Sequence, residues 1–194
     1  MPKQVTKTYT LFTIDELSDK AKAKALDALR VSMMQDFHYS EMINDDITEK
    51  IKELGLPITD IRWSHSSSQG DGLAIYGKVD LNEQKLIKTE EAMKKMFIEE
   101  SLDLVIEKVG PRNYDHYNTM CVDVSHGFED RTLKVRVFVE KFQEALQEKS
   151  RELFRELTRS YDWYFEDAQV IEDCRANDYV FLEDGKIANH LDEK

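Results

Sequence analysis

The sequence has 194 residues, of which 39 are acidic and 27 are basic, so its formal net charge is -12. This length is typical of one domain, and the 41% of hydrophobic residues are enough to form a core. The charge argues against a protein that coats nucleic acid, because lysine and arginine must neutralise the phosphates. With 7 Gly, 3 Pro and 2 Cys, the composition excludes collagen-like, low-complexity and disulfide-framework classes.

The N-terminal part of the sequence predicts a strand followed by two helices. Lys7 to Phe12 is expected to form the strand, and Thr13 with Glu16 matches a capping box at the start of the first helix. The expected core stripe of this helix is spaced by three or four residues and consists of Leu26, Leu29, Met33 and Phe37. A second helix is predicted from about Ser40 to Leu54, where Gly55 would end it.

The middle of the sequence predicts two hairpins separated by a helix. Alternating apolar residues predict strands at Thr59 to His65 and at Leu73 to Leu81, joined by a long tip. A helix is expected over Glu83 to Val109, with a buried stripe of Ile98, Leu102, Val105 and Val109. Met120 to Ser125 and Leu133 to Val139 alternate again, and they would pair around a turn at 127–130.

The last third predicts a long helix over Lys141 to Tyr164 and a short one over Ala168 to Ala176. The expected buried stripe of the long helix consists of Phe142, Leu146, Leu153, Leu157, Tyr161 and Tyr164. Because the strands come in adjacent pairs, we predict an α+β fold, with an antiparallel sheet built from hairpins and four to five helices packed on it. Residues 1–187 are expected to form a single domain, and residues 188–194 a frayed C-terminal tail.

The tip between the first two strands is the most unusual local sequence. Small hydroxyl residues, two glycines and an acid crowd into it, and glycine permits close approach of a ligand. Backbone amides in such a loop can bind an anion. The alternative is a turn that needs glycine only for its shape. The candidate binding residues here are Trp63, His65, Gln69, Gly70, Asp71 and Gly72.

A second candidate segment surrounds Tyr114 and His116, because an imidazole can serve as a general base or a ligand near neutral pH. The alternative is a polar loop that leads into a strand. If the sheet places the two segments side by side, His65, Asp71 and His116 would share a patch and support a small enzyme or ligand-binding module.

The third candidate is an acidic surface. Residues 140–194 contain 15 acidic and 8 basic residues, a net charge of -7. Carboxylates recur every four residues along the long helix, forming a ridge of Glu144, Glu148, Glu152 and Glu156. Arginines and lysines beside it favour pairing at i,i+4, so a solvated helix is the alternative to a surface that engages a basic partner.

Cofactor and metal chemistry have little support in the sequence. The five histidines show neither HxH nor HxxxH spacing, and CxxC, HExxH and GxSxG are absent. We therefore expect no metal and no cofactor, and binding rather than catalysis. Two cysteines and the lack of a long apolar run favour a cytoplasmic protein with both thiols buried and no membrane contact.

Four short blocks resemble a group of small uncharacterised bacteriophage accessory proteins, sometimes labelled antitoxin-like. The opening FTIDELSDKAK is similar to their F-x-E-L-S-x-x-A-K start, and SQGDG at 68–72 resembles their SQGDGA element. Tyr114-x-His116 with Met120 is similar to their Y-x-H-x-x-S-M segment. The stretch from Tyr161 to Lys186 resembles their C-terminal segment, which ends in I-x-A-N-D-Y-x-F-x-x-D-G-K.

The resemblance implies a phage-encoded protein that acts in the cytoplasm of an infected bacterium. We expect an acidic binding protein that inhibits a host protein. Its target would be a bacterial defence complex, which would make it an inhibitor of the anti-CRISPR or anti-restriction type, or a nucleic-acid-handling complex. Direct nucleic-acid binding is not expected, and the oligomeric state is left open. The alternatives are an antitoxin-like neutraliser of a toxin and the small enzyme or ligand-binding module described above.

Overall fold

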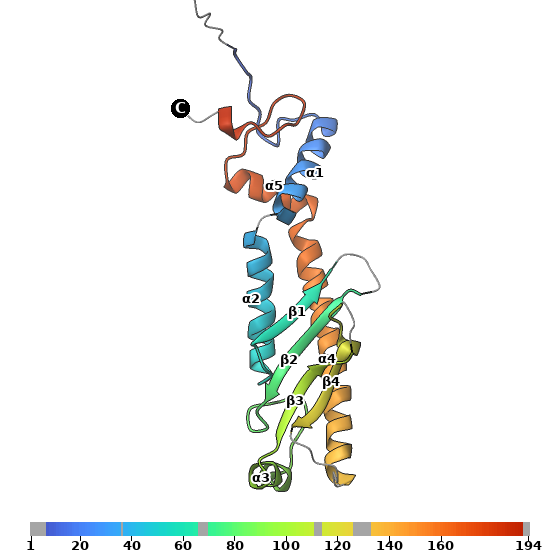
Figure 1. The fold of residues 1–194 in the computed structure, drawn as a ribbon. Coiled ribbons are helices and arrows are strands. Elements are labelled where there is room, and N and C mark those ends of the chain that lie inside the picture. Colours follow the sequence, from blue (N-terminus) through green and yellow to red (C-terminus); the bar gives the residue numbers. More distant parts are fainter. Residues whose placement is uncertain (1–6, 36, 66–69, 111–113, 126–132, 192–194) are drawn as a thin grey trace, which may run out of the picture. The chain divides into compact units, whose positions relative to one another are not determined.

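The computed structural model describes residues 7–35, 37–65, 70–110, 114–125 and 133–191. Five α-helices and four strands follow one another along this part of the chain, which confirms the predicted α+β class (Figure 1). Two compact units are present, one formed by residues 1–41 with 160–194 and the other by residues 42–159. The prediction of a single domain stays a prediction.

The second unit is built on an antiparallel sheet in the order β1-β2-β3-β4 (Figure 1). Its strands are β1 (Asp60–Ser64), β2 (Gly72–Val79), β3 (Asp103–Lys108) and β4 (Met120–Ser125). The first predicted hairpin is confirmed, because Ile61 pairs with Ile75 and Trp63 with Leu73 in antiparallel register. Gly55, which has φ +64°, ends the second helix as expected.

The predicted helix over Glu83 to Val109 is wrong. Helix α3 (Glu91–Glu99) covers only its middle, and β3 occupies the end that we expected to be helical. The chain turns at Ser101, which has φ +52°. Ile98, placed on the expected buried stripe, is 72% exposed. Beyond Ser101 the sheet buries alternate residues, Leu104 and Ile106, so tertiary pairing overrides the helical spacing.

The second predicted hairpin is also wrong. Residues Leu133 to Val139 are the first two turns of α4 (Leu133–Tyr164), and β4 pairs instead with β3. Val135, Phe138 and Phe142 are buried at spacings of three and four, which is a helical and not an alternating pattern. The turn expected at 127–130 lies outside the described residues.

Two helices cover one face of this sheet (Figure 1). They are α4 and the part of α2 (Phe37–Glu53) that begins at Met42, and the ion pair between Lys50 and Glu156 joins them at 2.7 Å. Ser150 is almost fully buried and donates to the Leu73 carbonyl at 3.1 Å. The core between them includes Ile43, Ile47, Ile51, Leu73, Ile75, Leu146, Leu153 and Leu157.

The edge of the sheet at β4 is covered by a side chain of α4. The Val122 amide donates to Gln143 Oε1 at 2.6 Å, and Gln143 Nε2 donates to the Met120 carbonyl at 2.9 Å. One glutamine therefore satisfies two backbone groups that an edge strand otherwise presents to another chain.

The first unit packs α1 (Asp19–Gln35) against α5 (Asp167–Ala176), and the predicted short helix is confirmed. Its core includes Leu26, Leu29, Met33, Val170, Cys174 and Phe181. The side chain of Phe37, predicted to extend this stripe, lies outside the described part. Cys174 is buried as expected, whereas Cys121 is exposed; both are free thiols.

The N-terminal prediction needs correction. The described part of Lys7 to Phe12 forms no strand, and Phe12 makes only an isolated bridge with Phe181. The Thr13 amide does donate to the Glu16 carboxylate at 2.8 Å, but this contact closes a turn. Helix α1 begins later, at Asp19, where Ser18 accepts from the Ala21 amide.

The C-terminal part continues past the expected domain limit at Ile187. Ala188 is fully buried and donates to the Val180 carbonyl at 2.8 Å, and Asn189–Leu191 form a 3-10 turn. The turn at Asp184 and Gly185 is present, and a side chain at Gly185 would lie 2.2 Å from the Ala21 carbonyl oxygen. No helix in the described ranges is long and apolar enough to cross a membrane.

Candidate functional site

The second unit, residues 42–159, contains the sheet and is called the sheet unit below. Two candidate segments from the sequence analysis meet in it, at Gly72 and His116. The first half of β2 pairs with β1, and the segment 114–119 lies close to β2, since the Tyr76 hydroxyl lies 3.2 Å from Thr119 Oγ1. A Cβ built on Gly72 would lie only 2.6 Å from His116 Cδ2. Only glycine therefore lets the imidazole lie against the β2 backbone.

His116 is held by its own loop. It caps the 3-10 turn Tyr117–Thr119, with Nδ1 accepting from the Asn118 amide at 3.1 Å. Its ring lies 3.6 Å from the Tyr117 ring, and Arg151 stacks on the same tyrosine at 4.8 Å. Burial, and then the positive charge of Arg151, lower the pKa of the imidazole. The lowered pKa favours the neutral ring, and because Nδ1 accepts from the Asn118 amide, that ring carries its proton on Nε2.

This geometry limits the chemistry of His116. A neutral imidazole accepts a proton through its unprotonated nitrogen, and here that nitrogen is occupied by the Asn118 amide. The ring can donate one hydrogen bond through Nε2. The arrangement therefore fits a positioned donor better than a general base.

Asp115 ties the same loop to three strands. Its carboxylate accepts from the Tyr76 hydroxyl and from Lys108 Nζ, both at 2.9 Å, and Arg62 lies 3.8 Å away. Burial opposes ionisation of Asp115, but Lys108 and Tyr76 outweigh it and the pKa of the carboxyl is lowered. Burial, aided by the bond to Asp115, raises the pKa of Tyr76 to about 12. The lowered pKa of Asp115 stabilises the folded state at neutral pH, whereas Tyr76 stays protonated there in both the folded and the unfolded chain.

The remaining residues of the predicted loop site make other contacts. Trp63 donates to Asn44 Oδ1 of α2 at 2.6 Å, and the His65 ring lies 6.4 Å from Phe154 of α4. Ser64 Oγ lies 3.2 Å from the Gly70 carbonyl and 3.5 Å from Asp71 Oδ1. Gln69 is outside the described residues, and Tyr114 is 42% exposed.

The predicted acidic ridge is present on α4, but most of it is paired. Glu148 forms an ion pair with Arg151, Glu152 with Lys149 at 2.9 Å, and Glu156 with Lys50 at 2.7 Å. Glu144 is exposed and forms no ion pair with the described residues. The ridge is thus a face of alternating charge, which weakens it as a surface for a basic partner.

A second acidic feature, at the end of α4, was not predicted. Trp163 is 50% exposed, and its neighbours Asp162 and Glu166 are exposed and form no ion pair with the described residues. The Glu166 amide donates to the Trp163 carbonyl at 3.2 Å, so the three residues share one turn. We call them the Trp163 patch. The available sequence clue was the position of Trp163, off the predicted buried stripe that contains Tyr161 and Tyr164.

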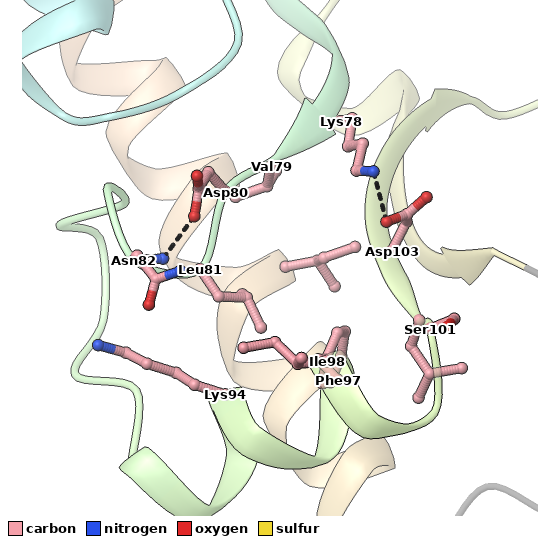
Figure 2. Close-up of a pocket in the computed structure, with 12 residues that line it drawn as sticks. Lys78, Val79, Asp80, Leu81, Asn82, Lys94, Phe97, Ile98, Ser101 and Asp103 are labelled. Atoms are coloured by element: carbon pink, nitrogen blue, oxygen red, sulfur yellow. Dashed lines mark hydrogen bonds and ion pairs between the residues drawn. The ribbon is translucent and has the colours of Figure 1, made fainter.

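The sheet unit also has a cavity of about 680 Å³ between the end of β2, the loop after it and α3 (Figure 2). Leu81, Phe97 and Ile98 supply apolar walls. The Lys78 ammonium and the Asp103 carboxylate at its rim pair with each other at 2.6 Å. This size suits a small ligand, but Lys78 and Lys94 are each paired, Lys94 with Glu91 at 3.0 Å. A ligand would have to compete with these ion pairs.

The fold and these sites define an α+β protein whose sheet is open. Among the described residues, no cluster of His, Cys, Asp and Glu is suited to hold a metal ion. A family described as a domain of unknown function (DUF8835) matches residues 39–167, and the chain belongs to that family. Searches of curated proteins and of solved structures found no match.

Proposed function

We propose that this protein binds a bacterial host protein and inhibits it, and that the Trp163 patch is the contact. The carrying observation is an exposed tryptophan flanked by two carboxylates with no ion pair in the described part of the chain. Tryptophan is one of the three residue types enriched among those that dominate binding energy at interfaces. The patch also lies within residues 160–194, the segment with the largest excess of acidic over basic residues.

Charge supports a basic target. Residues 160–194 contain ten acidic and three basic residues, a net charge of -7 within the total of -12. Complexes that handle nucleic acid expose lysine and arginine to neutralise phosphates. An acidic surface complementary to such a region would speed association and select the partner. The resemblance to phage accessory proteins supports a CRISPR or restriction complex of the host as that target, so that this protein would be an inhibitor of the anti-CRISPR or anti-restriction type.

The function is tested by expressing the protein in bacteria that carry an active restriction or CRISPR system. We expect a phage sensitive to that system to form more plaques when the wild-type protein is present. The variant with Trp163→Ala, Asp162→Asn and Glu166→Gln should lose this effect while accumulating to the same level. Unchanged plating with every such system, or equal protection by the variant, would contradict the proposal.

A further inference from the structure

A second hollow in the sheet unit is a groove bordered mainly by lysines, so its charge is opposite to that of the acidic Trp163 patch. It has a volume of about 430 Å³ and lies between the segment before α3 and the first turns of α4. Its apolar lining includes Leu133, which is 77% exposed, Val137, which is 39% exposed, and Phe138, which is buried. Ile87 and Met93 supply the opposite wall.

Three lysines border this groove, namely Lys88, Lys134 and Lys141, against a single carboxylate, Glu90. All three are exposed, and none forms an ion pair with the residues that the structure describes. Other lysines of the same unit behave differently, since Lys50, Lys94 and Lys149 each pair with a glutamate. Three lysines without an ion pair in the described part of the chain give this apolar groove a positive border, although the chain as a whole has a net charge of -12.

The spacing of the lysines indicates what the groove would recognise. Lys134 and Lys141 are seven residues apart on α4, so they lie on one face about 10 Å apart along the axis. Val137 and Phe138 lie between them on that face. In a peptide with polyproline II geometry, which has three residues per turn and rises about 3.1 Å per residue, two carboxylates three residues apart lie on one face and are separated by about 9 Å.

We infer that this groove binds an acidic peptide segment of a partner protein, with apolar residues between two carboxylates. The apolar side chains fill the space over Val137 and Phe138, and the carboxylates meet Lys134 and Lys141. A fatty acid carries a single carboxylate and would leave one of these two lysines unmatched. The groove and the Trp163 patch have no residue in common and are opposite in charge. An experiment that refutes one of the two proposed binding sites therefore leaves the other untouched.

The test is a selection of random twelve-residue peptides displayed on a surface, with the full-length protein as bait. We expect enrichment of peptides with two acidic residues separated by two apolar residues. Affinities are then measured by fluorescence anisotropy with the enriched peptides as probes. The double variant Lys134→Glu and Lys141→Glu should bind them at least about tenfold more weakly, because both contacts become repulsive. Added salt should weaken wild-type binding.

Lys95→Glu is the matched control, because Lys95 is on α3 and 75% exposed but does not line the groove. This variant should bind the enriched peptides as the wild type does. Leu133→Ser tests the apolar floor at a position exposed enough to leave the fold intact, and it should also weaken binding. The inference is overturned by a selection without enrichment, by peptides that bind the double variant equally well, or by vesicles of phosphatidylglycerol that bind through these lysines when no peptide does.

Discussion

At the scale of single residues, the contact between Gly72 and His116 is the most specific feature of the sheet unit. The two residues belong to segments whose composition predicted a site, and the structure places them in van der Waals contact. The sequence could not predict this contact. It depends on β3 pairing with β4 and on the segment 114–119 lying beside β2, and both follow from long-range pairing that local composition does not encode.

Gly72→Ala tests the contact. The new methyl group would overlap the imidazole, so we expect the free energy of unfolding to fall by about 1–3 kcal/mol. The measurement is urea unfolding followed by circular dichroism. In a His116→Ala background the same change should cost much less, because the obstructing ring is gone. An equal loss in both backgrounds would show that the ring is not what Gly72 accommodates.

The lowered pKa of His116 predicts a pH dependence. The unfolded chain takes up the imidazole proton at a higher pH than the folded chain, so protonation favours unfolding. The free energy of unfolding of the wild type, relative to His116→Gln, should therefore fall as the pH drops through about 6.5 and level off below the folded pKa. Proton NMR of the imidazole should give a pKa below that value, and Arg151→Gln should raise it. An unshifted titration would contradict the burial of this ring.

At the scale of elements, Gln143 connects α4 to the edge of the sheet. Replacing it by alanine leaves the Val122 amide and the Met120 carbonyl without their partner. We expect Gln143→Ala to lower the free energy of unfolding by about 1–2 kcal/mol. Gln147→Ala, four residues further along the same helix, should change it by less than about 0.5 kcal/mol. Equal effects of the two substitutions in thermal or urea unfolding would refute the role of Gln143.

The element predictions succeeded where local pattern and tertiary context agree. The hairpin β1–β2 and helices α2, α4 and α5 follow from alternation or helical spacing. They failed where β-branched residues begin a helix, as at Val135 and Val137, and where a helical spacing runs through a turn, as at Ser101. No glycine or proline marks Ser101, although the backbone there has φ +52°. Packing against the sheet, and not the local sequence pattern, determines that the chain is helical from Leu133 and leaves the helix at Ser101.

At the scale of the whole molecule, the charge of -12 is unevenly distributed. On the glutamate ridge, Glu148, Glu152 and Glu156 are neutralised by ion pairs. The acidic excess lies instead in residues 160–194, which carry a net charge of -7. Exposed ion pairs contribute little to stability, so Glu148→Gln should change the free energy of unfolding by less than about 1 kcal/mol. A larger loss in urea unfolding would show that the ridge has a structural role.

The most direct test of the proposed function is capture of the partner from a bacterial lysate at low and at high salt. The bait is the wild-type protein, the Trp163 patch variant, or a control with Tyr9→Ala, Asp45→Asn and Glu140→Gln. The control removes the same kinds of exposed groups elsewhere. We predict that one protein is retained by the wild type and the control, is released by salt, and is lost with the patch variant. Retention by the patch variant, loss with the control, or indifference to salt would contradict the account.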